Sequence, residues 1–250
     1  MIQSEARDGI VLLRFDRPPA NAIELESATA LETTLARLEA DGGVRAIVLT
    51  GQGAFFSAGL DLKVVPTYGV ADQRAMIAGI NRMIGRLYGL ALPVVAAVNG
   101  HAIAGGLVVA LACDYRVGRR GAYRLGLTET RVAIPYPAGP MAVVQAELAP
   151  AVARRWVLLA RNADPQDAFA DGVLDELQPA DALLPRALAL AGELAMLPRA
   201  AYGRIKRQLR GPTLERIDAA MSGEDPLVSA WISAETAPAA ADVLRRTRPS

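Results

Sequence analysis

A long uncharged stretch, LALPVVAAVNGHAIAGGLVVALAC, covers residues 90–113 and limits the folds that this chain can adopt. A membrane-spanning helix needs an apolar run of about 20 residues. Three interruptions, each typical of a turn or an element end rather than a helix centre, break this run: Pro93, Asn99-Gly100 and Gly105-Gly106. The stretch therefore predicts a buried strand, a turn and a buried helix within a globular protein.

Short β-rich runs alternate with longer helical ones in the first half of the chain, and this alternation predicts an α/β fold. The expected strands are 9–16, 44–51, 93–100 and 114–118, and the expected helices are 27–41, one within 71–90 and one starting near Gly105. Beyond about residue 140 the pattern is nearly continuous helix, apart from a short strand expected at 173–177. We expect a core domain at residues 1–190 and a helical C-terminal region at 191–250.

The charge balance limits the classes of partner. The chain has 27 Lys and Arg residues against 26 Asp and Glu residues, a net charge of +1. This balance argues against a nucleic acid or a membrane surface as the main partner. The segment AYGRIKRQLRG (201–211) puts a basic face on a helix. Such faces are usually solvated, and contact between Lys206 or a neighbour and a ligand phosphate is the alternative.

Cysteine usage and the chain ends indicate a reducing compartment. Cys113 is the single cysteine, so an internal disulfide and a Cys-based zinc site are excluded, and its apolar surroundings predict a core thiol. The N-terminal MIQSEARDG lacks the basic and apolar regions of a signal peptide, and the C-terminal RPS is not a recognised peroxisomal signal. We expect a cytoplasmic protein without a metal site.

The segment GQGAFFSAGLDL (51–62) follows an expected strand and replaces large apolar residues by small ones. Its start is similar to a dinucleotide-binding loop, but Phe56 stands where the third glycine belongs. Ser57 is not expected to be a hydrolase nucleophile, because Phe55 stands where the nucleophile elbow has glycine. The single histidine, His101, lies in an expected turn and is interpreted as a surface or packing residue rather than a base.

Two glycine-containing segments would each leave backbone N–H groups accessible. Ser57, Ala58 and Gly59 let a backbone approach something closely. Gly105 and Gly106 precede an apolar helix, whose first turn has N–H groups without internal partners. Tight packing explains either segment taken alone. If both converge on one oxygen atom they form an oxyanion hole, in which each donor is worth about 3 to 4 kcal/mol of transition-state stabilisation.

Four segments together resemble the crotonase family, the enoyl-CoA hydratase/isomerase superfamily. FSAGLDL, NGHAIAGGLVVALACDYRV and GLTETRVAIP resemble its three motifs, and RFDRPPANAI resembles its N-terminal coenzyme A loop. The resemblance covers residues 9–177. It implies a crotonase-like spiral of ββα units with a helical C-terminal trimerisation region, and therefore a homotrimer or a hexamer of two trimers. It also implies an acyl-CoA thioester substrate, with coenzyme A as part of the substrate and no separate cofactor.

The resemblance also assigns roles to individual residues. The backbone N–H groups of Leu60 and Gly105 would hold the thioester oxygen. Contacts with coenzyme A would come from the following residues: Pro19, Ala20, Ala58, Leu60, Asp61, Leu62 and Gly105. The side chains of Asp61 and Asp114 match family positions that serve structure.

The carboxylates decide the type of reaction. Hydratases of this family use two of them to hold and deprotonate the attacking water, and at the first position this chain has Val108. The second corresponds to Glu129, aligned with a one-residue shift, and Thr128 precedes it where many relatives have proline. A single glutamate can move a proton from the α to the γ carbon of a thioester without adding water, and burial would raise its pKa. The pattern is most similar to the mitochondrial-type Δ3,Δ2-enoyl-CoA isomerase branch, which predicts an isomerase of fatty acid β-oxidation.

Two alternatives remain open at this point. The first is another crotonase enzyme, such as a hydratase of relaxed mechanism, a lyase or a hydrolase, because one fold supports several chemistries. The second is a non-catalytic acyl-CoA-binding homologue. The segment 63–79 is expected to wall the acyl pocket, and it does not indicate the acyl chain length.

Overall fold

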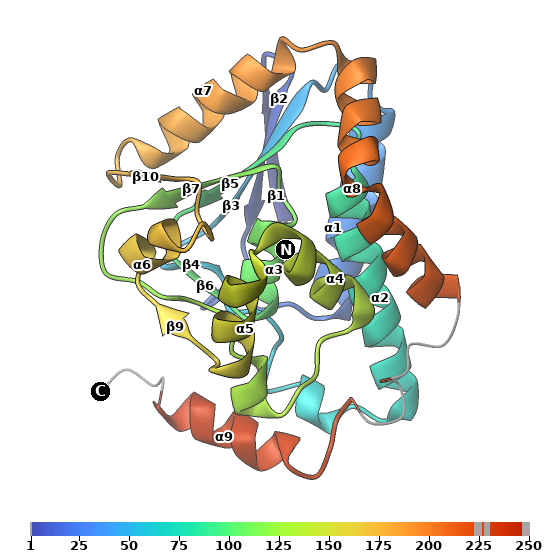
Figure 1. The fold of residues 1–250 in the computed structure, drawn as a ribbon, viewed down its shortest axis with the longest axis vertical. Helices are drawn as coiled ribbons and strands as arrows, with labels where there is room; N and C mark the ends of the chain where they lie inside the picture. The colour runs from blue at the N-terminus through green and yellow to red at the C-terminus, as the bar shows by residue number, and fades with distance from the viewer. Residues whose placement is uncertain (1, 223–226, 228–230, 247–250) are drawn as a thin grey trace.

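Two β-sheets organise the protein (Figure 1). The structure is a computed structural model that describes residues 2–222, 227 and 231–246. The six strands of the larger sheet, in spatial order, are β1 (Ile2–Arg7), β2 (Ile10–Phe15), β3 (Ala46–Gly51), β5 (Val94–Val98), β7 (Tyr115–Arg119) and β10 (Glu176–Gln178). The smaller sheet has the order β4 (Phe55–Ser57), β6 (His101–Ile103), β8 (Leu125–Gly126) and β9 (Asn162–Ala163).

Helices cover both faces of the larger sheet and form most of the second half of the chain. In chain order they are α1 (Leu25–Ala40), α2 (Val70–Gly89), α3 (Gly105–Leu111), α4 (Ala138–Glu147), α5 (Pro150–Leu158), α6 (Pro165–Ala170), α7 (Leu183–Ala195), α8 (Arg199–Ser222) and α9 (Thr236–Arg246). Two 3₁₀ turns are η1 (Val65–Thr67) and η2 (Glu129–Val132).

A ββα unit repeats along the chain. In each repeat one strand joins the larger sheet, the next joins the smaller sheet and a helix follows, as in β3-β4-α2, β5-β6-α3 and β7-β8-α4. The expected crotonase-like spiral is therefore confirmed. The strands from β2 to β10 in the larger sheet run parallel, which requires a crossover between neighbours, whereas β1 pairs antiparallel with β2.

Apolar periodicity explains why these elements pack as they do. All residues of β3 and β5 are buried, as expected for central parallel strands covered on both faces. In α1 the buried residues recur at helical spacing, so that one stripe faces the core: Ala28, Leu31, Leu35 and Leu38. On the opposite face of the sheet, α7 closes a second and smaller core with Leu183, Ala187, Ala191 and Ala195.

The sequence prediction located the larger sheet and missed the smaller one. FFS was expected to be a strand exit, yet Phe55–Ser57 form β4 of the second sheet. Strands of two or three residues are too short to show alternation. β1 was also missed, because five of its six residues are exposed and it lacks an apolar face. The domain division at residue 190 remains a prediction, and that residue lies inside α7.

The basic face expected on α8 is solvated only in part, because Arg204 and Arg207 are exposed whereas two other basic residues are not. Lys206 and Arg210 are buried and donate to Asp114, at 2.8 and 3.0 Å respectively. Lys206 also donates to the carbonyl of Leu92 at 3.1 Å. The expectation was wrong for these two residues because Asp114 and nearby carbonyls lie beneath the helix and require donors. The same contacts give Lys206 protein partners rather than a phosphate.

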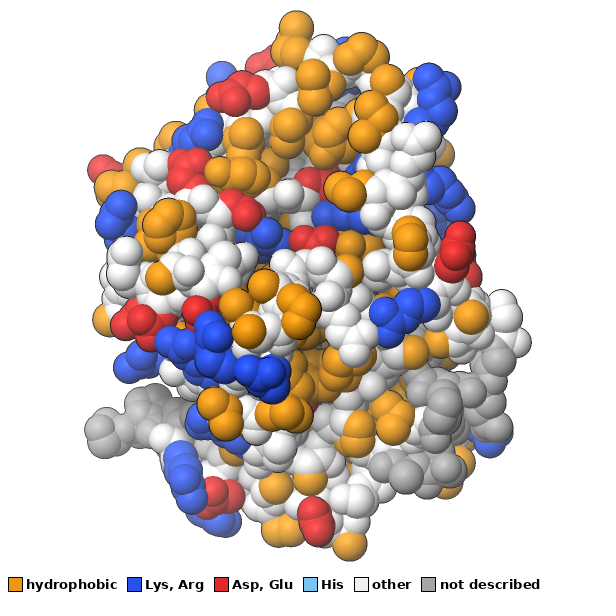
Figure 2. Space-filling model, viewed as in Figure 1, with side chains coloured by type: hydrophobic (Ala, Val, Ile, Leu, Met, Phe, Trp, Pro, Cys, Tyr) orange, Lys and Arg blue, Asp and Glu red, His pale blue; other side chains and the backbone are white. Residues whose placement is uncertain are grey.

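Charges of both signs are interspersed over the face shown in Figure 2. This distribution agrees with the near-zero net charge of the sequence. Among the described helices, none combines the length and the apolar character that crossing a bilayer requires.

Candidate active site

Three parallel strands of the smaller sheet direct their following loops to one edge. β4 pairs parallel with β6, with Ser57 opposite Ala102, and β6 pairs parallel with β8, with Ile103 opposite Gly126. The carboxyl ends of parallel strands lie at the same edge of a sheet. The residues that follow them, Leu60 after β4, Gly105 after β6 and Glu129 after β8, therefore gather at this edge.

The loop after β4 presents the Leu60 N–H away from its neighbouring segment. Leu60 forms a parallel bridge with Ile23, in which Ile23 N donates to Gly59 O at 2.7 Å and Asp61 N donates to Ile23 O at 3.0 Å. In such a bridge the N–H of the middle residue points to the other side. Within the described residues this N–H has no protein acceptor, and Leu60 is half-buried, so a ligand can reach it.

The start of α3 supplies the second predicted donor. Gly105 is the first residue of the helix, and its N–H has no acceptor among the described residues. Ala104 precedes it with φ 51° and ψ −128°, a conformation that a side chain disfavours. The Ala104 N–H donates to Gly126 O at 2.6 Å, which holds this turn against the end of β8.

Glycines bring the two donor segments into contact. Gly59 has φ +76°, and a Cβ atom there would lie 2.9 Å from the Gly105 nitrogen. A Cβ atom on Gly106 would lie 2.2 Å from the Ser57 oxygen, so Gly106 serves close packing between α3 and β4. A Cβ atom on Gly105 would meet nothing nearer than 3.8 Å. The predicted donors are therefore adjacent, and of the two α3 glycines only Gly106 is required by packing.

Glu129 is the carboxylate of this edge. It begins η2, its exposure is 7%, and no other Asp or Glu in the described part of the chain is as little exposed. Burial raises its pKa to about 7, against a hydrogen bond from Tyr136 that lowers it. The Tyr136 hydroxyl donates this short bond to Glu129 Oε2. A carboxyl group with such a pKa is populated in both protonation states near neutral pH.

The helix that carries the other hydratase position is apolar here. Val108 is fully buried in α3, and the helix from Gly105 to Leu111 contains no ionisable side chain. Of the two positions at which hydratases of this family are expected to carry a carboxylate, this chain therefore has one that is acidic, Glu129.

The predicted coenzyme A loop, which contains Pro19 and Ala20, is hydrogen-bonded directly to the segment that precedes Leu60. Ala58 N donates to Ala20 O at 3.0 Å, and Ser57 Oγ donates to Asn21 O at 2.7 Å. Asn21 has φ 50° and donates through Nδ2 to Phe55 O at 2.8 Å. Pro19 is exposed and Ala20 half-buried, so the loop keeps a surface free for a ligand.

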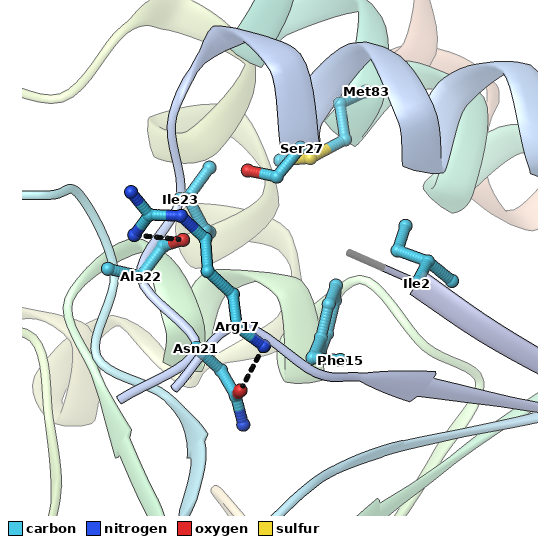
Figure 3. A pocket seen from close by; sticks show the side chains of 8 residues that line it. All are labelled: Ile2, Phe15, Arg17, Asn21, Ala22, Ile23, Ser27 and Met83. Carbon is cyan, nitrogen blue, oxygen red and sulfur yellow. Dashed lines mark hydrogen bonds between the residues drawn. The ribbon is translucent and has the colours of Figure 1, made fainter. Parts of the chain in front are cut away.

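Figure 3 shows how Arg17 and Asn21 shape the same loop. Asn21 Oδ1 accepts from Arg17 N at 3.0 Å, and the Arg17 guanidinium reaches the Ala22 carbonyl at 3.5 Å. The cavity beside them has a volume of about 10 Å³, enough for about one water molecule and too small for an acyl-CoA group. These two residues were not identified from the sequence, although RFDRPPANAI contains both.

Asp61 and Asp114 make structural contacts through their side chains. Asp61 accepts from Arg17 at 2.9 Å and from Lys63 N at 3.0 Å. Asp114 accepts from Val94 N at 2.8 Å in addition to its partners on α8. The structural interpretation of both carboxylates is confirmed, and contact of the Asp61 and Leu62 backbone with coenzyme A remains a prediction.

The C-terminal segment of the same chain packs over the Glu129 loop. Trp231 is fully buried and donates through Nε1 to Pro135 O at 2.9 Å. Thr236, the first residue of α9, donates to Ala133 O at 3.0 Å. Figure 1 shows α9 at the end of the molecule remote from α7. Sequence reasoning missed these contacts, which join residues about a hundred positions apart.

His101 and Cys113 have packing roles, as expected. The His101 ring stacks on Phe55 with centroids 4.8 Å apart, and burial, followed by two nearby arginines, lowers its pKa. Cys113 is fully buried, which raises its pKa to about 12. A cavity of about 560 Å³ is lined by His101 and Arg124. Because these residues stand at the amino ends of β6 and β8, it lies at the edge opposite Glu129.

The described residues contain no group of three or more His, Cys, Asp and Glu side chains arranged to hold a metal ion.

Comparisons with known proteins agree with this architecture. A family model described as "Enoyl-CoA hydratase/isomerase" matches residues 5–240. Human mitochondrial enoyl-CoA delta isomerase 1 is 30% identical over 219 residues, 87% of this chain and 72% of that protein. A putative enoyl-CoA hydratase from Thermus thermophilus is 37% identical over 198 residues, 78% of each chain. The crystal structure of human mitochondrial delta3-delta2-enoyl-CoA isomerase superposes with a TM-score of 0.92 at 28% identity, covering 98% of this chain and 97% of that one.

Proposed function

Because the chain belongs to the enoyl-CoA hydratase/isomerase family, we propose that this acyl-CoA enzyme is a Δ3,Δ2-enoyl-CoA isomerase. The observation that carries the proposal is that one of the two hydratase carboxylate positions is acidic: Glu129 is buried at that position, and α3 has Val108 at the other. Both isomerases and hydratases occur among the relatives, so the choice between them rests on these side chains.

The proposed reaction uses Glu129 as both base and acid. The carboxylate removes a proton from the α carbon of a 3-enoyl thioester, the double bond moves into conjugation as a dienolate, and the carboxyl group returns the proton to the γ carbon. No proton is gained or lost overall. A pKa of about 7 suits both steps, because the carboxylate must accept a proton and the acid must give it back.

The backbone donors would stabilise the charge that develops during this transfer. The Leu60 and Gly105 N–H groups are adjacent, lack protein acceptors within the described residues and are preorganised by the Gly59 and Ala104 conformations. Donors fixed before the reaction need no reorganisation when negative charge forms on the thioester oxygen. Coenzyme A, as part of the substrate, would lie along Pro19, Ala20, Ala58, Leu60, Asp61, Leu62 and Gly105.

Assembly and location form part of the same proposal. We expect a cytoplasmic homotrimer, or a hexamer of two trimers, with no separate cofactor. Large apolar side chains exposed near the end of α5 and on α8 support association with further copies of the chain: Leu158, Leu159, Ile205 and Leu209. Figure 2 shows apolar side chains exposed on the face that carries α7 and α8.

The test compares two reactions of the unmodified protein. Isomerisation of 3-hexenoyl-CoA is followed by the absorbance of the conjugated 2-enoyl product, and hydration of crotonyl-CoA by the loss of that absorbance. We expect isomerisation to be much the faster reaction. Hydration at a comparable rate would favour a hydratase, and tight acyl-CoA binding without turnover of either substrate would favour a non-catalytic homologue.

A further inference from the structure

Tyr136 touches the proposed catalytic carboxylate and has no role in the reaction as described so far. Its hydroxyl donates to Glu129 Oε2, and both side chains are buried. The two residues are seven positions apart, so η2 and the turn after it fold back to bring them together. A hydrogen bond from a neutral donor to a carboxylate is among the stronger kinds in proteins.

We propose that Tyr136 is a positioning residue: its hydroxyl occupies Oε2 of Glu129 and leaves Oε1 as the oxygen that takes and returns the substrate proton. The inference rests on the proposed isomerase function. One bound oxygen fixes the rotation of the carboxylate group, so the other stays directed at the substrate during both transfers. The same bond fills a position at which a water molecule would otherwise bind the carboxylate.

The Tyr136 backbone is held by the C-terminal segment. The carbonyls of Ala133 and Pro135, which precede Tyr136, accept from Thr236 Oγ1 at 3.0 Å and from Trp231 Nε1 at 2.9 Å. Ala133 has φ 52° at the end of η2, which turns the chain toward Tyr136. Both anchoring side chains are fully buried, so the hydroxyl is presented from a fixed backbone.

Charged side chains on the elements around the pair are engaged with one another. On α5, Arg155 pairs with Asp171 at 2.8 Å, and on α9, Asp242 pairs with Arg246 at 2.8 Å. On α4, the charged residue is Glu147, which binds Tyr88 and Arg116. The other charged side chains on or beside η2, α5 and α9 are exposed: Arg131, Arg154, Glu235 and Arg245.

Within the described residues, Tyr136 is thus the titratable group that contacts Glu129. Burial and the nearby Glu129 carboxylate raise the pKa of the Tyr136 hydroxyl. The hydroxyl keeps its proton at neutral pH and remains a donor. Donation favours the charged form of the carboxyl group, so it opposes the effect of burial on the Glu129 pKa.

The first experiment is Tyr136→Phe, which keeps the ring and removes the donor. We expect kcat for 3-hexenoyl-CoA to fall about 10-fold or more, the loss of a hydrogen bond to a charged group, while KM stays nearly constant. The acidic limb of the kcat/KM profile should move to higher pH, because the carboxylate loses the donor that favours its ionised form. An unchanged profile would overturn the proposal.

A second readout needs no turnover. The carboxyl C=O stretch of Glu129 is followed by infrared spectroscopy against pH in the substrate-free protein, and the band is assigned by its absence in Glu129→Gln. We expect its midpoint to rise in Tyr136→Phe. If the midpoint rises while the native protein isomerises nothing, the proposed function fails and the Tyr136 contact stands; an identical midpoint in both proteins contradicts the positioning role.

Tyr123→Phe is the matched control. Tyr123 is a buried tyrosine packed against His101 at the opposite edge of the smaller sheet, so its substitution should leave both readouts unchanged. Replacing Tyr136 by 3-fluorotyrosine tests the opposite direction without removing the hydroxyl. Its more acidic hydroxyl donates more strongly, so the Glu129 midpoint should fall, and a rise would contradict the proposal.

Discussion

Two clusters of buried or nearly buried polar side chains in this molecule are built differently. Asp114 lies beneath α8 with two cations in contact, Lys206 and Arg210. Glu129 lies at the edge of the smaller sheet, and its side-chain partner is the neutral Tyr136. A buried charge with cations beside it is compensated and serves structure, whereas one without them is poised to exchange a proton.

The C-terminal helices α8 and α9 each contact one of the two clusters, and the contacts differ in kind. α8 directs charged side chains toward Asp114, while Trp231 and Thr236 donate neutral hydrogen bonds to two carbonyls that follow η2, those of Pro135 and Ala133. The first arrangement adds charge to its cluster. The second arrangement adds no charge, so the pKa of Glu129 depends on burial, which raises it, and on hydrogen bonds from Tyr136 and the Glu129 backbone, which lower it.

Removing the charge of Asp114 should have the largest effect on stability. Asp114→Asn removes the carboxylate that pairs with buried Lys206 and leaves Arg210 only the more distant Glu147, at 3.6 Å, among its described carboxylate partners. We expect the free energy of unfolding in urea to fall by about 3 to 5 kcal/mol. The control is Asp242→Asn, which removes an exposed pair on α9 and should cost at most about 1 kcal/mol. Equal losses of unfolding free energy in the two variants would contradict the claim that the buried Asp114 ion pairs matter more for stability than an exposed pair.

Removing the charge of Glu129 should stabilise the protein, in a pH-dependent manner. Its folded pKa lies above that of an unfolded glutamate, so its contribution to stability is complete below pH 4.5 and lost as the pH rises through about 7. Glu129→Gln avoids that loss. We expect its unfolding free energy to exceed that of the native protein by about 3 kcal/mol at pH 8.5 and to match it near pH 4. A gain in unfolding free energy that does not depend on pH would contradict the claim that Glu129 is buried without a cation beside it.

Removing a neutral hydrogen bond between the C-terminal segment and the turn after η2 should have the smallest effect on stability. Thr236→Val keeps the shape of the side chain and removes two hydrogen bonds of the hydroxyl, the one it donates to Ala133 O and the one it accepts from Ser233 N. We expect a loss of about 1 kcal/mol in unfolding free energy and a reduction in isomerase activity of less than about 10-fold. A loss as large as that of Asp114→Asn would show that α9 carries as much of the stability as α8 does.

The sequence predicted the parts of this comparison that depend on local pattern. Long apolar runs located β3 and β5, and the glycines indicated two segments that the structure brings together, because each of these signals lies within a few consecutive residues. The donor roles of Leu60 and Gly105 came from the family resemblance and remain a prediction. The paired strands of the smaller sheet are two or three residues long and left no periodic trace.

Contacts distant in the sequence could not be predicted. Lys206 was interpreted as part of a surface face because its helix is rich in basic residues, and the partner that buries it, Asp114, lies 92 positions earlier. Tyr136 and Trp231 carry no motif. Their importance arises from the turn after η2 and from the path of the C-terminal segment, both of which are set by tertiary packing.

The role of Glu129 in proton transfer is best tested by the isomerisation rate of Glu129→Gln at pH 8, measured beside Arg131→Gln, an exposed change in the same turn. The account predicts that Glu129→Gln binds acyl-CoA normally, unfolds less readily than the native protein and loses at least about 100-fold in kcat, the contribution of a general acid–base group. Arg131→Gln should retain full activity. Undiminished isomerisation by Glu129→Gln would contradict the claim that this carboxylate, whose side-chain partner is a neutral tyrosine, moves the proton.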